Sequence, residues 1–287
     1  MKKLIVLGAV FVLAACSSKG PVKEATETPT SESSIAEAPT VVQEAATTPA
    51  AREEVPDRPP EKPVAPSQYA ALNEAIKVQS DDRIYQAAAQ ILTQTPNDAR
   101  ALNALAMYHY KRGRFDLSRY LLRKAISGSP KMAELHSNLG TVQLAQNEKR
   151  DAIKSYRRAL EINSDEPVAA ANLGSIYVQE RDFTKAQIVL EVAYRRGVRD
   201  PRVLNNYAIA LTSAQKYEKA EELYKAILKD GSNNREALFN YATLLVDNMG
   251  KYQDGLDVIN RLKFVGGPGD TRNRIIALEN KAKAGLK

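Results

Sequence analysis

A 34-residue period between residues 99 and 268 constrains the fold of this 287-residue chain more than any other feature. Five units start at residues 99, 133, 167, 201 and 235, and each holds a large residue followed by a small one at the same place. A unit of this length cannot bury an apolar face alone, so neighbouring units must stack to form a core. The pairs that set the register are Leu105-Ala106, Leu139-Gly140, Leu173-Gly174, Tyr207-Ala208 and Tyr241-Ala242.

A second set of recurring residues predicts that each unit is a helix, a turn and a second helix. Twelve residues after the first small residue comes another, and four residues later a large apolar or aromatic one. Spacings of three and four residues place side chains on one helix face. In the last unit Gly255 comes one position late, which we assign to an extra residue in the turn. The recurring residues are Ser118 and Leu122, Ala152 and Tyr156, Ala186 and Leu190, Ala220 and Tyr224, and Gly255 and Ile259.

This pattern resembles the tetratricopeptide repeat, a helix–turn–helix unit of 34 residues. The resemblance implies an all-α, right-handed superhelical solenoid, with small residues such as Gly140 leaving room for a neighbouring backbone. The chain departs from the family in having no Trp, and the position that often holds Trp is filled by Leu102, His136, Ala170, Leu204 or Leu238. The five predicted repeats are 99–132, 133–166, 167–200, 201–234 and 235–268.

Helical patterns also flank the five repeats. Residues 67–98 carry apolar residues at helical spacing and end near Pro96, which predicts a degenerate first helical pair. Residues 269–287 predict a C-terminal capping helix whose start is capped by Asp270. Its apolar residues are expected to cover the open end of the array, and they are Ile275, Ile276, Leu278 and Ala282.

Residues 1–15 have the pattern of a lipoprotein signal peptide. Two lysines precede a 12-residue apolar stretch, too short to span a bilayer, which ends in Leu13-Ala14-Ala15-Cys16 with the only cysteine of the chain. This segment resembles a bacterial lipobox, which implies cleavage before Cys16, a covalent lipid on Cys16 and no other cofactor. Ser17, in place of Asp, favours the periplasmic face of the outer membrane of a Gram-negative bacterium. The alternative is an ordinary signal peptide with a chance cysteine.

Residues 16–66 are predicted to form a disordered tether that begins at the lipidated cysteine. Residues 17–66 hold nine of the 14 prolines and neither Leu nor an aromatic residue. Such a segment cannot bury enough apolar surface to offset the entropy of ordering. Five Lys/Arg stand against nine Asp/Glu here, so the segment has a net charge of −4. As a flexible coil it would span about 40 Å and hold the folded part away from the membrane.

In the resemblance, the first helix of each repeat lines a concave peptide-binding groove. Four Asn residues spaced by 34 lie just before the register pairs. Such an Asn ladder either hydrogen-bonds a peptide backbone or supports packing between adjacent first helices, and the sequence leaves both roles open. Regular Lys and Arg are missing from this face, which disfavours a clamp for a terminal carboxylate. The predicted groove residues are Asn103, Met107, Tyr110, Asn138, Thr141, Asn172, Ser175, Asn205, Asn206, Ile209, Phe239, Asn240 and Thr243.

Charge and residue chemistry disfavour several other functions. From residue 67 onward, 34 Lys/Arg stand against 25 Asp/Glu, a net of +9. Many of these cations, including Arg157 and Arg195, fall on second helices, where they form either a solvated surface or a face that steers acidic partners. Nucleic acid is not an expected partner at a periplasmic location. His109 and His136 fit structural positions, and no metal or catalytic motif is present, so we expect a protein that is not an enzyme.

The lipobox, the tether and the small repeat array together resemble the TadD lipoprotein family of the tight-adherence (Flp) pilus system. The resemblance implies a periplasmic scaffold that assists assembly or localisation of a secretin or another pilus component. The alternative is a lipoprotein scaffold for peptidoglycan synthases or hydrolases, or for outer-membrane protein insertion. The partner, the binding face and the oligomeric state stay open.

Overall fold

The computed structural model describes residues 66–229 and 233–287, and within those ranges it holds thirteen α-helices, one π-helical segment and no strand. This confirms the expected all-α fold. The predicted signal peptide, Cys16 and the tether up to residue 65 lie outside the described residues. The helices are α1 (Pro66–Lys77), α2 (Asp81–Gln94), α3 (Ala99–Lys111), α4 (Phe115–Gly128), α5 (Ala133–Ala145), α6 (Lys149–Ile162), α7 (Pro167–Gln179), α8 (Phe183–Arg195), α9 (Pro201–Ser213), α10 (Tyr217–Leu228), α11 (Arg235–Thr243), η2 (Leu244–Asn248), α12 (Tyr252–Val265) and α13 (Arg272–Gly285).

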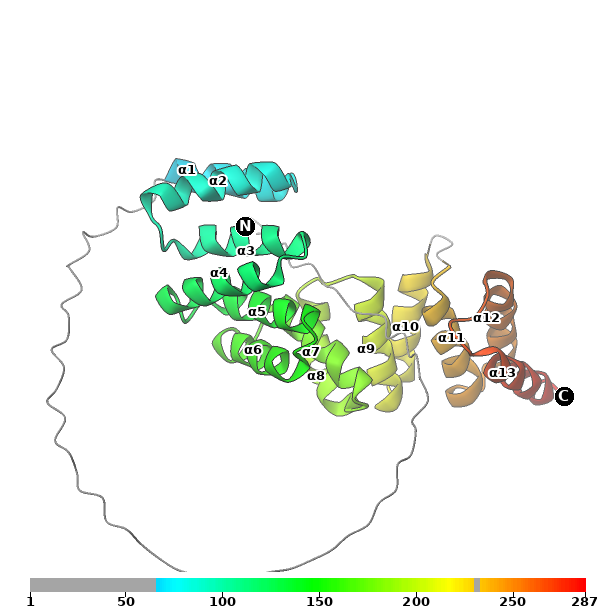
Figure 1. Cartoon of the computed structure of the whole chain (residues 1–287). Helices are drawn as coiled ribbons and strands as arrows, with labels where there is room; N and C mark the ends of the chain where they lie inside the picture. Colours follow the sequence, from blue (N-terminus) through cyan, green and yellow to red (C-terminus); the bar gives the residue numbers. More distant parts are fainter. Residues whose placement is uncertain (1–65, 230–232) are drawn as a thin grey trace, which may run out of the picture. The chain divides into compact units, whose positions relative to one another are not determined.

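Consecutive helices form antiparallel pairs, and each pair packs against the next in chain order (Figure 1). The turn inside each pair contains one residue in the left-handed region of backbone space. Because Gln79 lies 34 residues before Gly113, the α1–α2 pair follows the same register as the five repeats. The left-handed residues are Gln79 (φ 54°), Gly113 (71°), Asn147 (65°), Arg181 (61°), Gln215 (58°) and Gly250 (64°).

The extra residue of the last repeat lies in its first helix, so its assignment to the turn is wrong. Gly250, the left-handed turn residue, already lies 35 residues after Gln215, which places the insertion before the turn. The chain absorbs it in η2, where the N–H of Met249 donates to the carbonyl of Leu244 at 3.0 Å, five residues back. Helix α11 therefore continues into a wider, π-helical turn.

The left-handed turns predict a stabilising substitution. Arg181→Gly is expected to raise the free energy of unfolding by about 0.5–1 kcal/mol, because a side chain disfavours positive φ and glycine does not. Its side chain is exposed and forms no ion pair or hydrogen bond with the described residues, so no contact is lost. Gly113→Ala, at the equivalent turn, is the matched reverse change and should destabilise. Urea denaturation measures both, and equal signs would contradict the argument.

Two of the recurring small residues, Gly140 and Gly174, are required by side chains of the second helix in the same pair. A Cβ atom added to Gly140 would lie 2.8 Å from the ring of Tyr156, and one on Gly174 would lie 2.4 Å from Cγ of Leu190. The expectation that Gly140 makes room for a neighbouring backbone is therefore wrong. The large residues that recur in the second helices are all buried, and they are Leu122, Tyr156, Leu190, Tyr224 and Ile259.

The apolar core is divided along the chain. Buried side chains of α1, α2 and α3 form one cluster, those of α3, α4 and α5 form a second, and those from α6 to α13 form a third. Within the described residues, each helix pair thus buries its apolar face against its immediate neighbours, as expected for a repeat array.

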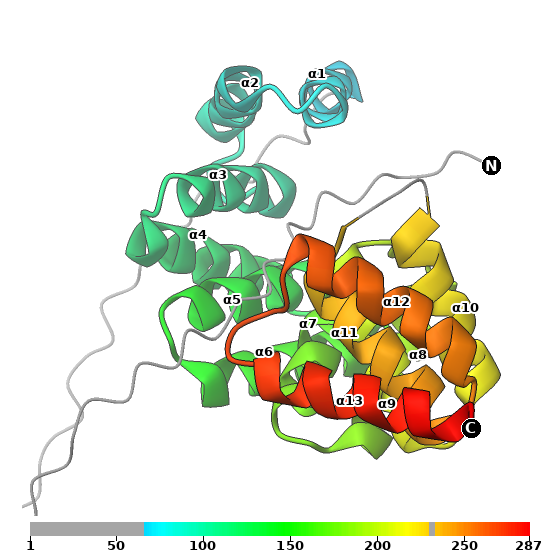
Figure 2. The ribbon, with the colours of Figure 1, turned by 90° about the vertical axis from the view of Figure 1, so that its right-hand side faces the viewer.

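Helix α13 packs beside α12 at the C-terminal end of the array (Figure 2). Ile275, Leu278 and Ala282 are buried there, as the apolar spacing predicts. Two details differ from the prediction. Thr271 precedes the first helical residue in place of Asp270, and Ile276 is 47% exposed, so it does not face the array.

Candidate peptide-binding groove

The predicted groove residues all lie on the first helices α3, α5, α7, α9 and α11, but they divide into two groups by exposure. The buried group leaves little side-chain surface for a ligand: Asn103, Tyr110, Asn138, Thr141, Asn172, Ser175 and Asn205. The partly exposed group is concentrated on α9 and α11: Met107, Asn206, Ile209, Phe239, Asn240 and Thr243. The accessible part of the predicted face is therefore its C-terminal half.

Several of the asparagines connect neighbouring first helices. Asn138 Nδ2 donates to Asn103 Oδ1 at 2.8 Å between α5 and α3, and Asn240 Nδ2 donates to Asn205 Oδ1 at 3.0 Å between α11 and α9. Because Asn138 and Asn103 are both buried, their bond is well shielded from water. These contacts support the packing role that the sequence left open beside the peptide-binding role.

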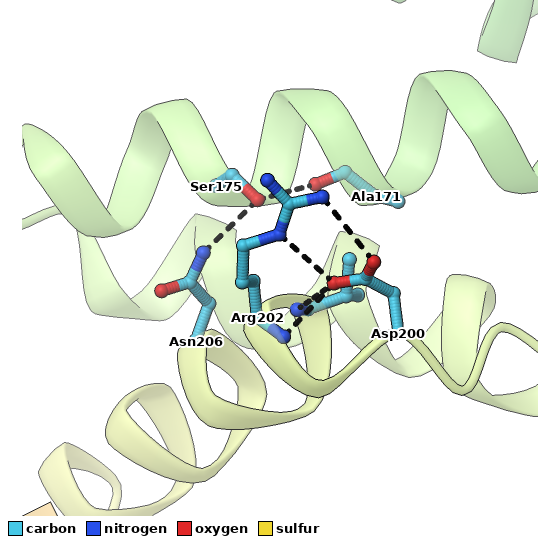
Figure 3. A network of polar contacts seen from close by, with 6 residues as sticks. Ala171, Ser175, Asp200, Arg202 and Asn206 are labelled. Atoms are coloured by element: carbon cyan, nitrogen blue, oxygen red, sulfur yellow. Dashed lines mark hydrogen bonds and ion pairs between the residues drawn. The ribbon is translucent and has the colours of Figure 1, made fainter. Parts of the chain in front are cut away.

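Between α7 and α9 the connection uses a serine, as Figure 3 shows. Asn206 Nδ2 donates to Ser175 Oγ at 3.0 Å, and that hydroxyl donates in turn to the carbonyl of Ala171 at 2.8 Å. Beside them, Asp200 caps α9 by accepting from the backbone N–H of Arg202 at 2.9 Å, and it also pairs with the Arg202 guanidinium at 3.4 Å. Asp200 thus caps the N-terminus of α9 and also pairs with the side chain of Arg202.

The N-terminal half of the face contains two carboxyl groups, Glu134 and Glu166, whose hydrogen bonds come from uncharged groups. Burial raises the pKa of both Glu134 and Glu166. Glu134 accepts from Asn103 Nδ2 at 2.9 Å, while Glu166 caps α7 through the N–H of Ala169. Within the described ranges the buried amide of Asn172 has no hydrogen-bond partner. This half is thus closed and built from buried polar groups.

The C-terminal half contains a cavity of about 410 Å³. Three of the predicted groove residues, Ile209, Asn240 and Thr243, line it. The other lining residues were not predicted from the sequence, and they come from the end of α9, the following turn, α10 and η2. The only sequence signal near them is the one-residue insertion in the last repeat. The missed residues are Thr212, Ser213, Gln215, Tyr217, Tyr224, Leu244 and Asn248.

The two aromatic residues among the predicted groove residues, Tyr110 and Phe239, lie outside this cavity. Tyr110 packs against the ring of Phe115 in the α3–α4 pair, with 5.7 Å between ring centroids. Phe239 lies near the guanidinium of Arg274 on α13, at 6.0 Å from its ring centroid. Both rings contact neighbouring parts of the array.

Basic residues of the second helices are largely engaged with acidic or polar neighbours. Arg119 contacts Glu148 at 2.7 Å, and Arg195 contacts Asp165 at 3.2 Å. Arg157 donates to the hydroxyl of Tyr177 at 2.9 Å. The ion pairs of Arg119 and Arg195 reduce the unpaired positive charge available to steer an acidic partner.

The described residues contain no group of three or more His, Cys, Asp or Glu placed to hold a metal ion. The same part of the chain has no helix with the length and apolar character required to cross a bilayer.

Comparisons with known proteins agree with the repeat register. Tetratricopeptide repeat families match residues 99–129, 133–166, 172–235 and 207–271. A tetratricopeptide repeat-containing protein of Dictyostelium discoideum is 25% identical over 131 residues, which cover 43% of this chain and 50% of that protein. The chain thus spans about half the length of this curated relative.

Solved structures show the same fold. YrrB, described as a tetratricopeptide repeat protein with an unusual peptide-binding site, has a TM-score of 0.56 at 14% identity, covering 70% of this chain and 99% of YrrB. A mutant form of MamA has a TM-score of 0.51 at 18% identity, covering 58% of this chain and 97% of that chain. With family matches across more than half of its length, the chain belongs to the tetratricopeptide repeat family, whose repeats indicate a scaffold for protein–protein interaction.

Proposed function

We propose that the protein is a lipid-anchored scaffold on the periplasmic face of the outer membrane, where it assists assembly or localisation of a pilus or secretion apparatus. The observation that carries the binding role is the cavity among α9, α10, α11 and η2, in the accessible half of the predicted groove. A segment of a secretin or another tight-adherence pilus component would occupy this groove, as the resemblance to TadD lipoproteins implies.

The anchor in this proposal is the lipid on Cys16, and no other cofactor takes part. The lipobox at residues 13–16 and the Pro-rich composition that follows it support a tethered array. Three acyl chains on a mature lipoprotein would hold far more firmly than one chain, which binds a membrane only marginally. The role is one of binding, without catalysis and without nucleic acid.

Photo-crosslinking in the native cell tests the partner. A crosslinking amino acid at Thr243, in the full-length lipidated protein, is expected to give adducts with a secretin or pilus subunit, because Thr243 lines the cavity. The matched position is Arg195, on a second helix. Adducts with a wall enzyme or an insertion-machine subunit would overturn the pilus assignment and keep the scaffold. Adducts from Arg195 alone would overturn the groove.

Fractionation tests the anchor separately. Cys16→Ser is expected to move the protein out of the outer-membrane fraction, because the only thiol that accepts the lipid is removed. Ser17→Asp is the control that keeps the lipid, and it should shift the protein toward the inner membrane. An unchanged outer-membrane fraction for Cys16→Ser would contradict the proposed anchor.

A further inference from the structure

We infer that the cavity among α9, α10, α11 and η2 binds an uncharged side chain of aromatic size from an extended peptide, and that the π-helical turn of η2 forms part of its wall. This inference rests on the proposed role of the groove and specifies what the groove recognises. It is carried by the composition of the lining, by its existing hydrogen bonds and by the place of the insertion.

The cavity offers no charge to a ligand. All ten of its lining residues, which belong to the described part of the chain, are uncharged. Asp247, the one acidic residue of η2, instead pairs with Lys281 of α13 at 2.7 Å. A charged side chain that entered the cavity would lose hydration without gaining an opposite charge, which is strongly unfavourable. The lining therefore selects against Asp, Glu, Lys and Arg.

The inner walls are apolar or already hydrogen-bonded. Ile209, Leu244 and the buried ring of Tyr224 supply apolar surface. The two threonine hydroxyls donate to carbonyls of their own helices, Thr212 to Ala208 at 2.8 Å and Thr243 to Phe239 at 2.9 Å. With these donors satisfied, the walls suit a large apolar or aromatic side chain. A volume of about 410 Å³ is also near the lower end for ligand cavities, which fits one such side chain with its flanking backbone.

The exposed lining residues are suited to a peptide backbone. Ser213, Gln215 and Asn248 line the cavity and are open to solvent. Their hydroxyl and amide groups both donate and accept hydrogen bonds, as the N–H and C=O groups of an extended peptide require. Polar groups at the opening and apolar walls inside are the usual division in a site that anchors one side chain.

The π-helical turn lies at this cavity and in none of the other described first helices. The first helices α3, α5, α7 and α9 keep the 34-residue spacing without an insertion. Because η2 takes up one additional residue, Leu244 and Asn248 reach the wall from a wider turn. Such turns are less favourable than regular α-helix and recur at functional sites. The insertion thus shapes the wall of the cavity, and both features lie at one place in the array.

The probe for the test is a phage-displayed library of random dodecapeptides, selected on the full-length lipidated protein in detergent micelles. Enriched peptides are expected to share one uncharged aromatic or large aliphatic position. Replacing that residue with Ala, Glu or Lys in the synthetic peptide should weaken binding at least tenfold. Enrichment of an acidic or basic residue at every shared position, or no enrichment at all, would overturn the inference.

Two variants locate the site. Ile209→Trp should fill the cavity and weaken binding of the selected peptide at least tenfold, while Met107→Trp, at the equivalent position of an earlier repeat, should not. Deletion of Asn248 restores the 34-residue spacing and should weaken binding similarly with an unchanged helical circular dichroism spectrum. If one variant fails to fold, the other decides, and wild-type affinity in a folded variant overturns the inference. If Thr243 gives adducts in cells but the library yields no selected peptide, the proposed function stands and this inference is rejected.

Discussion

Gly174→Ala is expected to lower the free energy of unfolding by about 1–3 kcal/mol, the usual cost of adding a methyl group to a filled core. The new Cβ would lie 2.4 Å from Cγ and 2.6 Å from Cδ2 of Leu190, which is fully buried, so this side chain or the helix must shift. The gain in helix propensity from Gly to Ala, about 1 kcal/mol, is included in this net loss. Thermal and urea denaturation measure the effect.

Gly128→Ala is the matched control for this prediction. Gly128 also lies in a helix, but a Cβ there would meet only a backbone oxygen of Asn97 at 3.9 Å. The control should be neutral or stabilising, because it gains helix propensity without a clash. Combining Gly174→Ala with Leu190→Ala should cost less than the sum of the single changes, since the second removes the atoms that the first contacts. Simple additivity would contradict this account.

Glu221→Gln is expected to destabilise the array by about 2–3 kcal/mol at neutral pH. Burial alone would raise the pKa of Glu221, but hydrogen bonds from Lys225, Lys251 and Tyr241 outweigh it and lower the pKa to about 2. The two lysine contacts are short, with Lys251 Nζ at 2.6 Å and Lys225 Nζ at 2.8 Å, and Tyr241 Oη donates at 3.1 Å. A neutral amide loses both ion pairs and leaves the Tyr241 hydroxyl with a weaker acceptor.

The same carboxylate predicts a pH dependence. Its folded pKa, about 2, lies below the unfolded value of about 4.3, so its contribution is complete above pH ~4.3 and is lost as the pH falls toward 2. The unfolding free energy of the wild type should therefore fall more steeply across this range than that of Glu221→Gln. Glu222→Gln, at an exposed neighbouring position, is the control and should change stability by less than about 0.5 kcal/mol. Parallel pH curves for wild type and Glu221→Gln would contradict the prediction.

The repeat register could be predicted from the sequence because packing in a helix pair depends on positions that recur with the period. Tyr156 and Leu190 were predicted from spacing alone, and both are buried. The offset of the asparagine contacts could not be predicted in this way. Asn138 bonds to Asn103, which lies 35 residues earlier, so the amide contacts cross the 34-residue alignment by one position.

The cavity also could not be predicted from the spacing of residues in the sequence. An insertion changes the length of a unit, but the length does not say whether a turn or a helix absorbs it. The backbone hydrogen bond from Met249 to Leu244 answers that question. Tyr217 and Tyr224 line the cavity from α10, and their approach to α11 depends on how two successive pairs pack. Only three-dimensional packing brings these residues together.

The division of the apolar core into three clusters has a mechanical consequence. A force applied at residue 66 would meet the small cluster of α1, α2 and α3 first, and only later the large cluster that begins at α6. Because each pair is held by its neighbours, extension should proceed in steps, with the amino-terminal pairs yielding at lower load. Under load, such an array would lengthen at its amino-terminal end while the end that contains the cavity stays folded.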